Sequence, residues 1–349
     1  MTKNPATQEL RTCAIGAVAS VLLYASGFLV LFTPLPLLYV FINKGRRAGV
    51  LSSAIAVAIV VLLYIALLPI LGAKAAEGGA MILMFPGVGL MEQAGMAKIQ
   101  FFGAAYYLFF CSIAVTLSEG ARRNWSVTRW VGTTIGVGIG CIIIMALAAQ
   151  VATGASLLTG VQDYVQRAVT EFTEINCATG SQTFQARYLI EHGSEIAKAI
   201  TSLMPSLVFV FVLLAVVLNM LVSRRLAKVP HALRRLRETV TFRLPDQFVW
   251  FVVGGGVVFF ANYYLFHDNM LKAVAVNVII AMGAIYFFQG FAVVTFFLGR
   301  LRSRFMRLVV YLSIIIFFHT AALMLAGIGL ADVWVHFRER FFSRPPRAA

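Results

Sequence analysis

Long apolar blocks separated by short polar segments dominate the chain. A helix of about 20 residues, rising 1.5 Å per residue, crosses a bilayer core of about 30 Å. Eight blocks have the required length: residues 12–32, 47–71, 98–118, 130–153, 201–222, 247–266, 273–298 and 308–328. The pattern predicts an all-α polytopic integral membrane protein with about eight or nine transmembrane helices.

Two shorter apolar segments interrupt this pattern. Residues 33–43 begin with Pro34 and Pro36, which lack the N–H for a helical hydrogen bond, so we expect a short or broken helix there. Residues 80–91 contain Pro86 and two glycines and are typical of a re-entrant or surface segment. Non-helical backbone at membrane depth must be buried in protein or line a cavity. Whether either segment fully crosses the bilayer stays open.

Composition excludes an ordinary soluble protein. The 349 residues are 60% hydrophobic and 12% charged, whereas a soluble domain is about 45–50% apolar and about 25% charged. The net charge of +15 would suggest a nucleic-acid partner in a soluble chain, but here the basic residues lie between apolar blocks. We therefore predict the lipid bilayer as the partner and no nucleic acid.

The distribution of basic residues predicts an orientation. Of the 29 Lys and Arg residues, 19 lie in five segments that the positive-inside rule places in the cytoplasm: residues 1–11, 44–47, 119–129, 223–246 and 299–307. The alternate connections hold six. If 33–43 crosses, the amino terminus is cytoplasmic and the basic carboxyl tail is external. The predicted location is a bacterial cytoplasmic (inner) membrane.

The connection 154–200 is too long for a simple turn. Residues 157–176 show the periodicity of an amphipathic helix, and 183–200 form a second, weaker one. A lid over an external opening and a helix lying on the bilayer surface are both compatible with this pattern.

Recognisable catalytic sequence motifs are absent. The chain has no nucleophile elbow, zinc-protease motif, P-loop or dinucleotide-binding motif. Its four cysteines include no Cys-x-x-Cys pair and no Cys/His spacing typical of a metal site. We expect a protein that is not an enzyme, with no metal and no cofactor.

Polar side chains at membrane depth are the candidate ligand-binding residues. Gln289 and His319 lie near the midplane of two successive predicted helices, where they could meet, and Asn262 and Asn277 share a shallower level. The interrupted segments supply three more candidates, Tyr39, Asn43 and Glu92. An intramembrane ionisable residue is a functional hypothesis. The alternative is interhelical bonding, worth about 0.6 kcal/mol on average.

Several short motifs together resemble the YybS-like family of bacterial predicted membrane proteins, which has no established biochemical function. They are Pro34–Pro36 followed by Gly45–Gly49, Phe242–Trp250, Asn277, Tyr286–Val293 and Gly329–Arg338. The resemblance extends over nearly the whole chain.

The first 222 residues also resemble the S components of energy-coupling-factor vitamin transporters. That resemblance implies a six-helix core with an externally open pocket. The family's Ala-x-x-x-Ala docking motif is absent from the first helix, which has only Gly16-x-x-x-Ser20, although Ala54-x-x-x-Ala58 occurs later.

The predicted organisation has four parts. A transmembrane core (1–222) is followed by a basic cytoplasmic linker (223–246), a three-helix unit (247–328) and an amphipathic basic tail (329–349). We predict binding and transport of a small, vitamin- or metabolite-like molecule, with an energising or envelope protein as a further partner. The alternative is a non-transporting membrane scaffold or envelope assembly factor.

Overall fold

The computed structural model describes residues 5–27, 29–75, 96–123, 125–153, 162–163, 165–167, 170, 184–226, 244–301 and 303–337. None of the residues in these ranges lies in a β-strand. The longer helices are α1 (Pro5–Ala25), α3 (Arg46–Ala75), α5 (Met96–Arg122), α6 (Val127–Thr153), α8 (Phe184–Leu226), α10 (Val249–Ala261), α11 (Asn269–Arg300), α12 (Arg304–Ile316) and α13 (Phe318–Val335). Shorter helical elements are η1 (Val30–Phe32), α2 (Pro34–Lys44), η4 (Asp246–Phe248) and η5 (Asn262–Phe266).

Seven helical segments in the described part of the chain are long and apolar enough to cross a membrane. They are Arg46–Ala66, Gly103–Arg122, Val127–Val151, His192–Ser223, Asp246–Phe266, Asn269–Arg300 and Phe318–Val335. The predicted fold class is confirmed: the protein is an all-α, polytopic membrane protein. The short apolar helix predicted at 33–43 is also present, as part of the apolar segment Val30–Lys44. Its two prolines lie in the first turn of α2, where a missing N–H breaks no helical bond.

The first predicted span, 12–32, does not form a single helix. Helix α1 begins at Pro5 and ends at Ala25, and its first turns contain polar residues, so it is not among the seven candidate spans. Gly27 has a φ of 65°, a left-handed value that favours glycine. The Ser26 hydroxyl donates to the Leu23 carbonyl at 2.7 Å and accepts from the Leu29 N–H at 3.1 Å. These bonds close the turn and end the helix.

Two further boundaries differ from the sequence prediction. The block 308–328 is divided at Phe317, whose ψ of 38° leaves the helical range, into the separate helices α12 and α13. The second amphipathic helix predicted at 183–200 is not a separate element: its described residues, 184–200, belong to α8, which continues from Phe184 to Leu226 with Pro205 in its interior. The segments 80–91 and 223–246 lie wholly or mostly outside the described residues, and 157–176 is described at only six positions.

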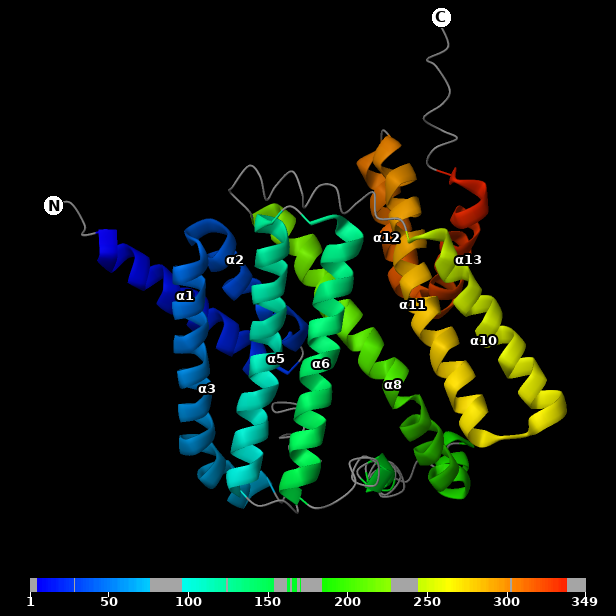
Figure 1. The fold of residues 1–349 in the computed structure, drawn as a ribbon, viewed down its shortest axis with the longest axis horizontal. Helices are drawn as coiled ribbons and strands as arrows, with labels where there is room; N and C mark the ends of the chain where they lie inside the picture. The colour runs from blue at the N-terminus through cyan, green and yellow to red at the C-terminus, as the bar shows by residue number, and fades with distance from the viewer. Residues whose placement is uncertain are drawn as a thin grey trace, which may run out of the picture. The chain divides into compact units, whose positions relative to one another are not determined.

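The chain divides into two compact units, Met1–Met204 with Phe211–Arg237 and Pro205–Val210 with Glu238–Ala349. In unit 1, α3, α5 and α6 lie beside one another, and α2 packs on α3 and α5 (Figure 1). The core of this unit is rich in aromatic side chains, among them Tyr24, Tyr64, Tyr107, Phe110 and Trp130. In unit 2, α10 and α11 form a hairpin joined through η5, and α13 packs against α11.

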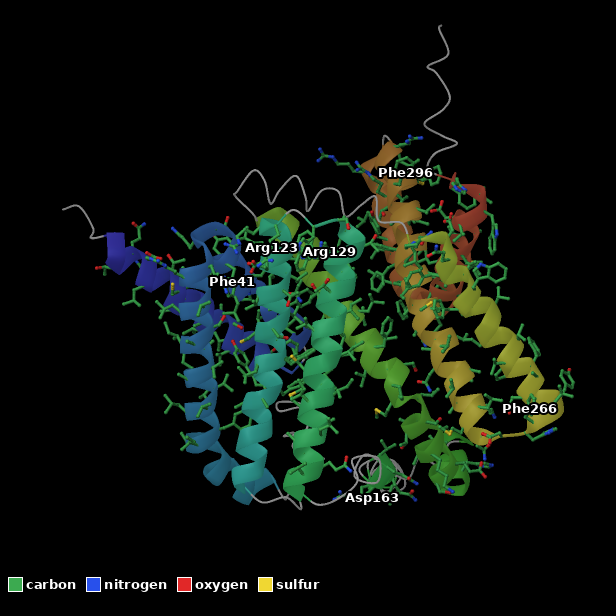
Figure 2. All side chains as sticks on the ribbon, in the orientation of Figure 1. Phe41, Arg123, Arg129, Asp163, Phe266 and Phe296 are labelled. Carbon is green, nitrogen blue, oxygen red and sulfur yellow. The ribbon has the colours of Figure 1, made fainter. Side chains whose placement is uncertain are left out.

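Charged side chains gather at the turn between α5 and α6. Glu119 accepts from Arg122 at 2.7 Å and from Arg123 at 2.6 Å, and the guanidinium of Arg129 lies 5.1 Å from the ring centre of Trp125. Figure 2 shows Arg123 and Arg129 at the same end of these two helices. This end of the hairpin therefore presents a basic surface, as expected of a segment outside the bilayer core.

Candidate functional site

The chain interruption between α1 and α2 is held by side chains from three other positions in unit 1. Ser20 of α1 donates to the Thr33 carbonyl, with 2.7 Å between Oγ and O. The hydroxyls of Ser20 and Tyr107 are also 2.7 Å apart. Because serine has one hydroxyl proton, Tyr107 must be the donor in this second bond. A serine on α1 and a tyrosine on α5 therefore meet at the start of α2.

Asn219 of α8 binds the same interruption from another side. Its Nδ2 donates to the carbonyl of Leu31 at 2.6 Å and to the carbonyl of Ala215 at 2.7 Å. The first bond holds a carbonyl of η1, which lies outside the regular helices. We name Ser20, Leu31, Thr33, Tyr107 and Asn219 the interruption cluster.

Two polar atoms of the interruption cluster are buried without a hydrogen-bond partner. They are Oγ1 of Thr33 and Oδ1 of Asn219, and both side chains are fully buried. Buried polar groups in native proteins are nearly always hydrogen-bonded, so two unpartnered atoms in this one cluster are informative.

A layer of tyrosines borders the cluster. Tyr24 donates to the Gly103 carbonyl at 3.0 Å, so the Tyr64 hydroxyl, 3.1 Å away, donates to Tyr24. The rings of Tyr24 and Tyr107 are 5.2 Å apart and nearly perpendicular, a favourable edge-to-face arrangement. Gly103 allows the Tyr64 ring to approach α5 closely, because a Cβ at this position would meet that ring. Aromatic surface with a few precisely placed polar groups is typical of small-molecule sites.

The candidates predicted in the first interrupted segment lie in the second half of α2. Asn43 donates to the Tyr39 carbonyl at 3.0 Å, and Tyr39 packs beside a small buried cluster of Cys13, Val40 and Ala48. Both side chains are half-buried. The predicted residue Glu92 lies outside the described residues.

The prediction that Gln289 meets His319 is wrong. Gln289 is fully buried, accepts from the Leu244 N–H at 3.3 Å and donates to Oδ2 of Asp332 at 3.4 Å. His319 is exposed, with its ring beside that of Phe318. The physical reason is the close crossing of α11 and α13 at Gly290 and Gly329, which brings Asp332 rather than His319 to the Gln289 amide.

The crossing of α11 and α13 depends on two glycines. A Cβ on Gly290 would meet the carbonyl of Leu325, and a Cβ on Gly329 would meet the carbonyl of Tyr286. The two backbones are therefore in direct contact, as small residues permit in membrane helices. One turn further along α13, Asp332 is buried, and its Oδ1 accepts from the Phe337 N–H at 3.0 Å.

Sequence reasoning missed Asp332, Asn219, Ser20 and Thr33 as site residues. A signal for Asp332 existed, because it lies in the motif Gly329–Arg338, but that motif follows the predicted end of the last span. Ser20 and Asn219 are single small polar residues inside apolar helices. Nothing in their local sequence shows that they face a chain interruption.

The two predicted asparagines bind separate partners. Asn262 accepts from the Asp268 N–H at 2.9 Å through its side chain and from the His267 N–H at 2.8 Å through its carbonyl, which closes the turn after η5. Asn277 accepts from the Ser206 N–H at 2.8 Å, beside Pro205 of α8. Asn277 thus makes a hydrogen bond between two helices, which was one of the two alternatives left open by the sequence. Asn262 stabilises a turn.

Metal-ion ligands do not gather in the described ranges: no group of three or more His, Cys, Asp or Glu side chains there could hold a metal ion. The chemistry that the interruption cluster offers is hydrogen bonding by hydroxyl and amide groups, next to tyrosine rings.

A family model described as "Predicted membrane protein (DUF2232)" matches residues 93–333. This range includes Tyr107, Asn219, Gln289 and most of α13, whereas α1, α2 and α3 precede it. No curated protein and no solved structure matches the chain.

Proposed function

We propose that this chain, which belongs to the DUF2232 family of predicted membrane proteins, binds a small molecule and carries it across the bilayer. The observation that carries the proposal is the interruption between α1 and α2. There Asn219 donates to the carbonyl of Leu31 in η1, and Ser20 donates to the carbonyl of Thr33, the residue that caps the start of α2.

The physical argument starts from the cost of irregular backbone inside a membrane protein. Non-helical backbone at membrane depth is tolerated where protein buries it or where it lines a cavity. Transporter binding sites are often built from such discontinuous helices, because their free backbone groups can coordinate a solute. A regular helix through this region would leave no such groups.

The surroundings of the interruption support the same proposal. Tyr24, Tyr64 and Tyr107 present aromatic surface and hydroxyl groups, a composition that suits a small, partly apolar molecule. We propose that the pocket opens to the outside of a bacterial cytoplasmic membrane, that an energising protein is the partner, and that the solute is moved without chemical change.

An uptake experiment tests the proposal. The purified protein is reconstituted in vesicles, a defined mixture of metabolites is supplied outside, and the vesicle contents are measured by mass spectrometry. We expect at least one compound to enter protein-containing vesicles and not empty ones. Ser20→Ala removes the bonds to Thr33 and Tyr107, and we expect it to reduce that uptake about tenfold.

Ser53→Ala is the matched control. Ser53 is a half-buried serine of α3 whose hydroxyl donates only four residues back along its own helix, to the Gly49 carbonyl at 3.0 Å. Uptake by this variant should equal that of the parent protein. If no compound enters, and the protein instead co-purifies with an envelope complex, the alternative role as a membrane scaffold replaces transport.

A further inference from the structure

We infer that Thr33 and Asn219 form the hydrogen-bonding centre of a site for a small, uncharged solute that carries an N–H or O–H donor. The inference rests on the proposed function for the solute's passage and deepens it by naming the binding atoms and the ligand class.

The orientation of the Asn219 amide follows from its neighbours. Both short contacts of its Nδ2 are to carbonyl oxygens, those of Leu31 and Ala215, and a carbonyl oxygen can only accept. The NH₂ group must therefore face them, and Oδ1 must point elsewhere. That oxygen is buried with no donor. A ligand that completes this site must supply an N–H or O–H group.

Thr33, which lies between η1 and α2, supplies the second unmet group. Its backbone carbonyl is already bound by Ser20, while its Oγ1 is buried and unpartnered. A hydroxyl can donate as well as accept. Because Asn219 binds Leu31 and Thr33 follows η1 directly, the two unmet groups flank one stretch of backbone. A solute that binds both atoms needs a donor for Oδ1 and a donor or an acceptor for Oγ1, a combination that the edge of an amide carries.

The absence of charge among the buried polar residues described in unit 1 favours an uncharged ligand. In the described part of unit 1, the buried polar residues are Ser20, Thr33, Ser52, Thr134, Thr201, Asn219 and Ser223, with no charged group among them. Burying an ion without a counter-charge is costly, whereas a neutral amide needs only its hydrogen bonds. The tyrosine layer adds apolar, aromatic surface beside the same atoms. A neutral amide-bearing heterocycle combines these properties.

Pairs of probes that differ in charge test the ligand class. Thermal unfolding of the purified full-length protein is measured with nicotinamide and with uracil, and then with their carboxylate counterparts nicotinate and orotate. We expect a neutral probe to raise Tm in a dose-dependent way and its anionic counterpart to have no effect. Equal shifts by both members of a pair, or no shift by either neutral probe, overturn the inference.

Thr33→Val tests the binding atoms while keeping the side-chain shape. We expect this variant to fold with an equal or higher Tm, because it removes a buried hydroxyl that has no partner. We expect its affinity for the neutral probe to fall at least tenfold. Asn219→Leu should lose the same affinity. Parental affinity in both variants would show that the probe binds elsewhere and would overturn the assignment.

Thr134→Val is the matched control, because Thr134 is also a fully buried threonine of unit 1. Its hydroxyl donates to the Trp130 carbonyl at 2.8 Å, so the group is satisfied. This variant should keep the parental affinity for the probe.

The uptake measurement separates this inference from the proposed transport. If the Thr33→Val variant takes up solute as well as the parent protein does, the inferred binding site is wrong and the proposed transport function is retained. Conversely, probe binding that depends on Thr33, in a protein that moves nothing into vesicles, supports the site and overturns transport.

Discussion

Gln289 of α11 donates a hydrogen bond to Asp332 of α13, with 3.4 Å between Nε2 and Oδ2. The exposed fractions of the two residues are 0% and 2%. The other end of the Gln289 amide accepts from Leu244, and the other carboxylate oxygen of Asp332 accepts from Phe337. The buried Gln289 amide therefore connects three parts of unit 2: the segment at Leu244, α11 and the end of α13.

Replacing Gln289 should destabilise unit 2. Gln289→Leu removes the acceptor for the buried Leu244 N–H and one donor to a buried carboxylate. We expect a loss of about 1–3 kcal/mol in the free energy of unfolding, measured by denaturant titration in detergent. His319→Ala is the control and should change it little, because His319 is exposed. A larger effect of the His319 substitution would contradict the geometry.

The contact between α11 and α13 should tolerate no added carbon atom. Gly290→Ala places a Cβ against the Leu325 carbonyl, so the helices must separate, and we expect a loss of stability of about 1–3 kcal/mol or more. Gly283→Ala, on the same helix, meets nothing within 4 Å. It should be neutral or stabilising by up to about 1 kcal/mol, because alanine favours helix over glycine. Equal Tm values for the two variants would exclude the close crossing.

The bond between Asn277 and the Ser206 N–H should be coupled to Pro205. Asn277→Leu leaves a backbone donor beside the proline without this acceptor, and we expect a loss of about 1–3 kcal/mol. In a Pro205→Ala background the helix can straighten and offer its own carbonyl to that N–H. The cost of Asn277→Leu should then be smaller. A double-mutant cycle of unfolding free energies measures the difference, and strict additivity would contradict the coupling.

The orientation predicted from the basic residues can be tested by labelling. Lys272, in a connection predicted to be external, and Arg123, in one predicted to be cytoplasmic, are both exposed. In a background carrying Cys177→Ser, Lys272→Cys should react with an impermeant maleimide added to intact cells, and Arg123→Cys should not. The opposite pattern would invert the topology and, with it, the side from which the proposed pocket opens.

Part of the fold could be read from local sequence. Apolar length predicted membrane helices, and the paired prolines predicted a short helix at α2, because both effects act within one or two turns of chain. Boundaries were less predictable at Ser26–Gly27 and at Phe317. The apolar pattern continues through both, and the helix ends only where backbone geometry and local hydrogen bonds replace the helical ones.

The sequence by itself determined the class of the protein: long apolar segments are stable only inside a bilayer, and their backbone groups must be satisfied within helices. Only the tertiary structure decided which polar residues meet. Ser20 and Thr33 meet Tyr107 and Asn219 from distant parts of the chain, and Gln289 binds Asp332 instead of His319. The reason is that a side-chain hydrogen bond acts over about 3 Å, whereas helix crossings, set by glycines and chain breaks, decide which residues come that close.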